Sequence, residues 1–332
     1  MFGSRIWRIV LYYCSNTKSR CTVGTANPFI SFHREAELDQ HTAGVIRVRG
    51  TASQALPLVL DSPHSGTDYP EDFAHQADPS RLRSAEDSHV HDLFKGALDR
   101  GAVMLDALFP RSYIDPNRAQ NDFLPASLGA AEADHLPFQL EPTVKSDLGI
   151  GLIWMRVPPD GEPMYPQPLA AATVLQRLAG YYQPYHAALR ECLDRTYRTF
   201  GRVFHINCHS MSNQASAMST QPKGTRRPDF VIGDRDGTSC DPLLTQTLYE
   251  FLTAQGYQVT INDPYKGVEL VRAYSDPVHD RHSVQLEINR RLYMDETSRE
   301  KNSDFEKIQI VLEHAIDALA PLLHTSGAKT AQ

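Results

Sequence analysis

Short apolar runs separated by polar turns recur along the chain, and several have the length of buried β-strands. Residues 57–60 form one such run, which stops at a Ser-Pro-His-Ser-Gly corner where proline and glycine oppose its continuation. A second run, residues 203–208, leads directly into His209 and a serine. Each run therefore places a histidine, His64 or His209, where we expect a strand to end.

Other segments show the three-and-four spacing of amphipathic helices. We expect one helix within residues 81–100, with Ser84 as its N-cap and with Glu86 and Asp87 in the first turn after it, where the helix dipole favours acids. A second helix, over residues 169–200, should break or kink at Pro184. The remaining predicted elements are helices at 243–256 and 305–323, and strands at 45–49, 102–105, 229–233, 257–261 and 283–289.

Strands that alternate with helices predict an α/β fold, in which a single mixed or mostly parallel sheet is flanked by helices. We expect residues 39–324 to form one domain, with a long inserted loop at about 121–166 that is rich in Pro, Gly, Asp and Ala. Residues 1–38 are basic and are expected to be a poorly ordered tail; a targeting leader is the alternative. Ligands of open α/β sheets bind beyond the carboxyl ends of the strands, so His64 and His209 should meet there.

Composition narrows the class of partner. The net charge of −7 gives no basic surface for nucleic acid or an anionic membrane, so a small molecule is the expected partner. No apolar run approaches the ~20 residues that a membrane span needs. The five cysteines are scattered and form no CxxC pair, which favours a reducing compartment and hence the cytoplasm.

The two histidines suggest a metal site. Catalytic zinc takes three ligands from His, Asp and Glu and keeps one position open. His64 and His209 would need a carboxylate as the third ligand, for which we prefer Asp87 and keep Glu86 as the alternative. Adjacent helical residues point about 100° apart, so only one of these two acids can reach the metal. Other divalent metals suit the same ligands. If both histidines are only structural caps, no metal should bind.

A charged residue on a strand built for burial is a second candidate. Glu287 could serve as a general base, since a buried acid needs a partner or a task; the alternative is an ion pair with Arg290 or Arg291. Arg118 and Arg272 could bind an anionic substrate, because guanidinium groups bind carboxylates bidentately, although the sequence alone favours reading both as surface arginines. The GxSxG, GxGxxG, GxxxxGK[ST] and HExxH motifs are absent, which argues against serine-hydrolase, nucleotide and thermolysin-like chemistry.

Taken together and in this order, the motifs resemble the N-formylglutamate amidohydrolases. The resemblance runs from about residue 40 to about residue 320. It implies a phosphorylase/hydrolase-like (zinc-exopeptidase-like) fold shared with metallocarboxypeptidases and aspartoacylases, and a place in histidine degradation. The blocks that carry it are residues 57–66, 86–87, 115–118, 207–211, 229–234, 262–267 and 285–290.

The resemblance also implies site roles. One zinc ion per chain would be held by His64, Asp87 and His209, although the wider group takes its carboxylate from an HxxE motif, and here position 67 is threonine. Glu287 corresponds in order to the general base of that group. The block Asp-Pro-Asn-Arg at 115–118 is similar to a segment of aspartoacylases in which Asn and Arg hold a substrate carboxylate or polarise the scissile carbonyl.

Those two residues are Asn117 and Arg118, and charge matching adds Arg272 as a further carboxylate anchor. The implied reaction is zinc-dependent hydrolysis of N-formyl-L-glutamate, or of a close anionic N-acyl amino acid, to the amino acid and formate or another carboxylate. Two alternatives remain open at this point. The chain could act on another N-acyl amino acid or a small peptide, or it could be a binding protein without catalysis.

Overall fold

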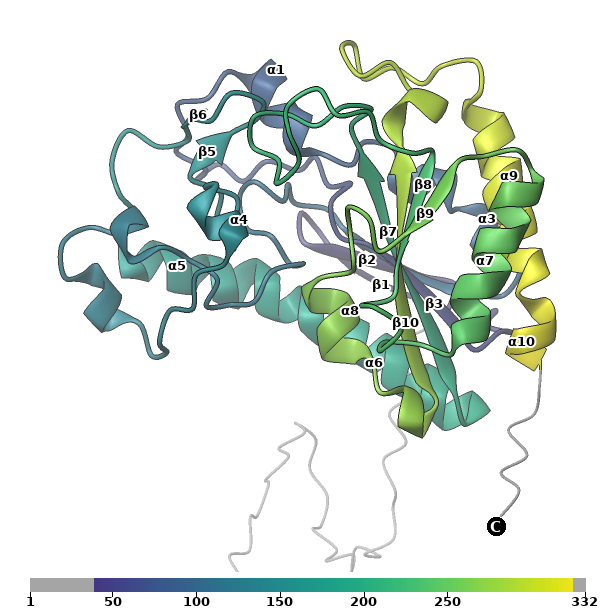
Figure 1. Ribbon diagram of the computed structural model, residues 1–332. Helices are drawn as coiled ribbons and strands as arrows, with labels where there is room; N and C mark the ends of the chain where they lie inside the picture. Colours follow the sequence, from purple (N-terminus) through teal and green to yellow (C-terminus); the bar gives the residue numbers. More distant parts are fainter. Residues whose placement is uncertain (1–38, 325–332) are drawn as a thin grey trace, which may run out of the picture. The chain divides into compact units, whose positions relative to one another are not determined.

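The computed structural model describes residues 39–324, so the predicted basic tail over residues 1–38 lies outside the described residues. One mixed sheet of eight strands dominates this part of the chain (Figure 1). In spatial order its strands are β1 (Gln40–Thr42), β2 (Ile46–Arg49), β4 (Val103–Ala107), β3 (Leu58–Ser62), β7 (Val203–Met211), β10 (Arg281–Asn289), β8 (Phe230–Gly233) and β9 (Val259–Ile261).

The four central strands, β4, β3, β7 and β10, run parallel, whereas β2 and β8 join them antiparallel. Parallel strands end at the same edge of a sheet, where crevices form. The register sets Asp61 of β3 opposite Asn207 of β7, and His209 of β7 opposite Glu287 of β10. The residues that follow β3 and the last residues of β7 and β10 therefore meet at one edge.

Helices cover both faces of this sheet, which confirms the predicted α/β class. The α-helices are α1 (Pro79–Leu82), α2 (Val90–Leu93), α3 (Gly96–Asp99), α4 (Val144–Asp147), α5 (Ala171–Arg177), α6 (Gln183–Phe200), α7 (Pro242–Ala254), α8 (Glu269–Tyr274), α9 (Phe305–Ala318) and α10 (Ala320–His324). One apolar core joins Val59 to α5 and α6, and a second joins Leu58 and Leu60 to α7 and α9. None of the helices within residues 39–324 has the length and apolar character required to cross a membrane.

The single helix expected within residues 81–100 is wrong. The segment divides into α1, a 3-10 turn (Arg83–Ala85), α2 and α3, and residues 86–89 between them are not helical. The amide of Asp87 donates to the carbonyl of His64 (2.9 Å), and His89 adopts a left-handed backbone with φ of 65°. A tertiary hydrogen bond to the β3 corner thus replaces the helical one.

The long segment after β4 carries several short elements. Residues 121–166 contain α4, two 3-10 turns (Pro125–Ser127 and Glu132–His135) and a small two-stranded sheet of β5 (Arg156–Val157) and β6 (Glu162–Pro163). Buried side chains such as Phe123 and Leu152 join this segment to the same core as Val59. The segment is therefore packed onto the sheet.

The predicted break at Pro184 is wrong, because α5, a π-helical turn (Leu178–Tyr182) and α6 follow one another without a gap. The helix type changes just before Pro184, whose missing N–H removes a backbone hydrogen bond from the helix.

Candidate active site

The corner after β3 fixes His64. Gly66 is packed so tightly that an added Cβ would lie closer than 3.0 Å to backbone atoms of Leu108 and Phe109, which explains why glycine stands there. The hydroxyl of Ser65 donates to the carbonyl of Asp87 (2.9 Å), and the amide of Asp87 donates back to the carbonyl of His64 (2.9 Å). The histidine corner and the segment that holds Asp87 are thus tied together through their backbones.

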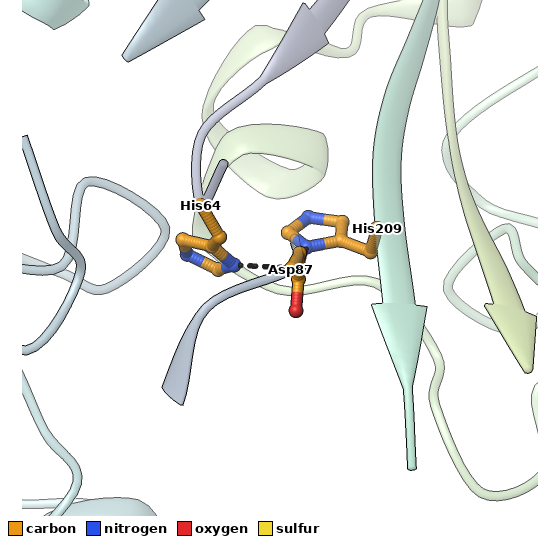
Figure 2. A group of neighbouring side chains, drawn as sticks. All are labelled: His64, Asp87 and His209. Atoms are coloured by element: carbon orange, nitrogen blue, oxygen red, sulfur yellow. Dashed lines mark hydrogen bonds and ion pairs between the residues drawn. The ribbon is translucent and has the colours of Figure 1, made fainter. Parts of the chain in front are cut away.

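The second histidine lies inside a strand, because β7 continues through His209 to Met211 instead of ending before the histidine. His64, Asp87 and His209 are all buried, with at most 2% of each residue exposed. Figure 2 shows the carboxylate of Asp87 and both imidazole rings converging. The Nδ1 atoms of His209 and His64 lie 3.1 Å and 3.3 Å from Asp87 Oδ2, and the three candidate ligand atoms all lie within 4.8 Å of one another.

These separations fit a metal ion. Ligand bonds of about 2.0–2.2 Å in tetrahedral geometry put neighbouring donor atoms about 3.3 Å apart. The remaining ring nitrogens have other partners: Nε2 of His64 lies 2.8 Å from Asp115 Oδ1, and Nε2 of His209 lies 2.7 Å from Asn207 Oδ1 and 3.0 Å from Asn117 Nδ2. A metal bound at Nδ1 requires the tautomer with its proton on Nε2, which these oxygen partners favour, as do the outer contacts that orient metal-binding histidines; without a metal, each Nδ1 can instead donate to Asp87.

The surroundings of Asp87 stabilise its ionised, negatively charged form. Burial alone would raise its pKa, but hydrogen bonds from His209 and His64 and the nearby Arg111 hold the pKa well below its ordinary value. Its other oxygen, Oδ1, accepts from Arg290 (3.0 Å). An ionised carboxylate beside two imidazole lone pairs is a donor set suited to Zn²⁺ or a similar divalent ion.

The neighbouring acid faces elsewhere. Glu86 accepts hydrogen bonds from the hydroxyls of Tyr69 (2.7 Å) and Ser88 (3.2 Å), and it pairs with Arg83 (3.3 Å). Asp87, not Glu86, belongs to the group that could hold a metal.

A third buried acid, Glu287, lies beside this group. Its Oε1 accepts from Nε2 of Gln285 (2.8 Å), and burial raises its pKa. Neither of the arginines considered from the sequence pairs with it, because Arg290 binds Asp87 and Arg291 binds Asp229. Glu287 is thus left facing the cavity without a bonded cation.

The structure separates the three residues expected to bind substrate. Asn117 and Arg118 are buried and line the same cavity as His64, Asp87 and His209. The guanidinium of Arg118 donates from Nη1 to the carbonyl of Asn117 (2.9 Å) and from Nε to the carbonyl of Ile150 (3.3 Å). Arg272 is mostly exposed, pairs with Glu269 (2.8 Å) and lines a different surface hollow. We therefore leave Arg272 out of the site.

The cavity that holds these groups has a volume of about 410 Å³, enough for a small amino-acid derivative. Sequence reasoning missed several of its residues. Asp115 belongs to one of the motif blocks, but the sequence assigned it no role. In the structure its carboxylate lies between His64 Nε2 (2.8 Å) and Nη2 of Arg111, which donates to it (2.8 Å). Lys145 and Arg227 carried no local signal, because only the fold brings them to this cavity.

The fold and the site define a class: α/β proteins with a candidate His/Asp/His metal centre and a separate buried carboxylate in one small-molecule cavity. The chain belongs to the N-formylglutamate amidohydrolase family, whose profile matches residues 56–294. This confirms the resemblance seen in the motifs.

Related proteins agree with this assignment. The chain is 30% identical over 271 residues to the N-formylglutamate deformylase of Pseudomonas putida, with 80% of this chain and 92% of that protein covered. It is 30% identical over 245 residues to the protein of the same name from Pseudomonas aeruginosa, with 73% and 83% covered. The crystal structure of N-formylglutamate amidohydrolase from Ralstonia eutropha JMP134 is 42% identical and has a TM-score of 0.78, with 84% of this chain and 98% of that chain covered.

Proposed function

We propose that this protein hydrolyses N-formyl-L-glutamate to L-glutamate and formate, with one divalent metal ion, expected to be zinc, at His64, Asp87 and His209. The observation that carries the proposal is the convergence of these three candidate ligand atoms beside Glu287 in one cavity. The names of the relatives support the substrate. When bound, the ion would supply a Lewis acid that polarises a carbonyl and lowers the pKa of water.

Glu287 is the proposed general base. In the reaction, water adds to the formyl carbon, the C–N bond breaks, and the amine leaves with an added proton. Glu287 accepts the proton from water at its carboxylate and then returns it to the leaving nitrogen. Its raised pKa suits this exchange, because a base works best when its pKa lies nearer the working pH.

Arg118 and Asn117 have different proposed tasks. The backbone carbonyls that hold Nη1 and Nε of Arg118 leave its Nη2 for a ligand, so it can stabilise negative charge on the carbonyl oxygen. The side chain of Asn117 donates to Asn207 Oδ1 (3.3 Å) and accepts from the amide of Leu270 (2.9 Å). We infer that Asn117 positions the strand-end polar groups around His209 as well as lining the cavity.

The remaining proposals concern context. We assign catalysis to a single domain over residues 39–324 and place the reaction in the degradation of histidine. The described cysteines, Cys192, Cys208 and Cys240, are free thiols, and their state supports a reducing compartment such as the cytoplasm.

The experiment is formate release from N-formyl-L-glutamate by the purified protein, before and after chelation and after zinc is restored. We expect turnover that chelation abolishes and zinc recovers. Turnover that chelation leaves intact would refute the metal assignment. Bound zinc without formate release would instead point to another N-acyl amino acid, a small peptide or a non-catalytic binding role.

A further inference from the structure

The cavity is lined by more cations than its acids can neutralise. Its acids are Asp87 and Glu287. Half of its basic residues have their own carboxylates: Arg290 pairs with Asp87, Arg111 with Asp115, and Lys266 with Asp236 on the surface. The six basic residues of the lining are Arg111, Arg118, Lys145, Arg227, Lys266 and Arg290.

The other three, Arg118, Lys145 and Arg227, form no ion pair with any carboxylate in residues 39–324. The guanidinium of Arg118 is bonded to backbone carbonyls. Against these three cations stands one free carboxylate, Glu287, so the lining holds an excess of two positive charges before any metal is counted. An anionic substrate such as N-formylglutamate would offset this excess.

Lys145 is held in place by its backbone. It lies on α4, whose N-cap Thr143 accepts from the Lys145 amide (3.1 Å). Both the amide and the hydroxyl of Thr143 donate to the carboxylate of Asp122 (2.9 Å and 3.0 Å), and Ser146 also donates to Asp122. The short helix is therefore fixed to a buried acid. The ammonium group of Lys145 has no hydrogen-bond or ion-pair partner among the described side chains.

Arg227 is oriented by neutral groups. Its Nη1 donates to the hydroxyl (2.8 Å) and carbonyl (3.2 Å) of Ser212, its Nη2 donates to Ser219 (3.3 Å), and its guanidinium lies 5.4 Å from the ring centre of Tyr265. These contacts fix the side chain but leave its charge uncompensated. A preorganised guanidinium of this kind binds a carboxylate with little loss of side-chain freedom.

We propose that Lys145 and Arg227 form an anion subsite that binds the side-chain carboxylate of an N-acyl dicarboxylic amino acid, and so select acidic over neutral amino acids. This assignment rests on the proposed function and leaves Arg118 for the reacting carbonyl. Burial and the nearby Arg118 and Arg111 lower the pKa of Lys145 to about 8, and a bound carboxylate would offset both effects.

The test compares N-formyl-L-glutamate with N-formyl-L-glutamine, which has the same shape but a neutral side chain. Lys145→Met should lower kcat/KM for the glutamate substrate about 10- to 100-fold, the scale of one lost charge-assisted hydrogen bond, and leave the glutamine substrate nearly unchanged. Arg227→Gln should act in the same direction, and Lys145→Arg should restore part of the preference.

Lys266→Met is the matched control. It removes a cation from the same lining, but one whose charge is already paired with Asp236, so it should keep the preference. A bound-metal content and a melting temperature equal to those of the unaltered protein verify that each variant is folded. Lys145→Gln is a second replacement to use if Lys145→Met does not fold.

Two outcomes separate this inference from the proposed function. If the unaltered protein releases formate but Lys145→Met keeps its glutamate preference, or loses activity equally on both substrates, the subsite is wrong and the function stands. If the unaltered protein hydrolyses neither substrate, the function falls, and calorimetric binding of glutarate decides the subsite. Binding that weakens at least tenfold in Lys145→Met supports it, and unchanged binding overturns it.

Discussion

Neighbouring residues of the same type have different tasks in this site. Glu86 and Asp87 are adjacent and equally buried, yet Glu86 is satisfied by hydroxyls and Arg83 whereas Asp87 faces two imidazoles. The break in the expected helix decides this, because it lets the backbone of Asp87 bond to the His64 corner. Side-chain chemistry supplied both candidates, and backbone geometry chose between them.

The proposed general-base role of Glu287 predicts a specific loss of activity. Glu287→Gln keeps the size of the side chain but cannot accept a proton from water, so kcat should fall by ~10² or more while bound metal stays at the unaltered level. Formate release and metal analysis measure the two quantities. Glu86→Gln, which changes an equally buried acid that faces away from the cavity, should retain metal and activity. Retained activity in Glu287→Gln would remove that residue from the mechanism.

Lys145 predicts a pH effect on substrate binding. Its pKa is lowered to about 8, so the free protein carries this charge below that pH and loses it above. The KM for N-formyl-L-glutamate should therefore rise at alkaline pH, by up to ~10-fold per unit. The groups that set this pKa are Arg118, Arg111, Arg227 and Glu287.

Two controls, a neutral substrate and an arginine variant, test whether Lys145 causes the alkaline rise in KM. The alkaline rise in KM should be absent with N-formyl-L-glutamine and should move beyond the accessible range in Lys145→Arg, because arginine remains charged. An identical alkaline limb in Lys145→Arg would assign the titration to another group.

At the scale of elements, close packing fixes the corner after β3, which holds the candidate ligand His64. Gly66→Ala would drive a Cβ into the backbone near Leu108 and Phe109, which cannot yield as a flexible side chain can. We expect a loss of about 1–3 kcal/mol in the free energy of unfolding and weaker metal binding, because His64 shifts with the corner.

Urea unfolding and metal titration measure these two effects. Gly180→Ala is the control, since an added Cβ there meets nothing within 4 Å and the residue lies in the helical region between α5 and α6. It should leave stability unchanged or raise it by about 0.5–1 kcal/mol. Equal stability of the two alanine variants would show that the corner is more tolerant than its packing indicates.

At the scale of the molecule, the site exists only in the folded chain. Its candidate ligands come from three separate segments, and the fold brings Asp87 between His64 and His209. A metal that binds the folded state but not the unfolded chain stabilises the protein by about 2.7 kcal/mol at a free concentration one hundred times its Kd.

Chelation should therefore lower the melting temperature by several degrees, and added zinc should restore it. Scanning calorimetry of the full chain measures the shift, and His209→Ala should show none because it removes one ligand. A chelator-independent melting temperature in the unaltered protein would contradict a metal site at these residues.

The sequence by itself determined the elements whose signal is local. The apolar runs at 57–60 and 203–208 become β3 and β7, because strand burial is set by neighbouring residues. The motif blocks also identified the family and brought His64, Asp87, His209 and Glu287 forward as candidates.

Only the tertiary structure decided which charges face one another. It separated Asp87 from Glu86, directed Arg290 to Asp87 instead of Glu287, and left Arg272 outside the cavity. It also brought Lys145 and Arg227, which are 82 positions apart in the chain, into one lining. These pairings depend on strand register and on how distant segments pack, and no local pattern of hydrophobic and polar residues encodes either.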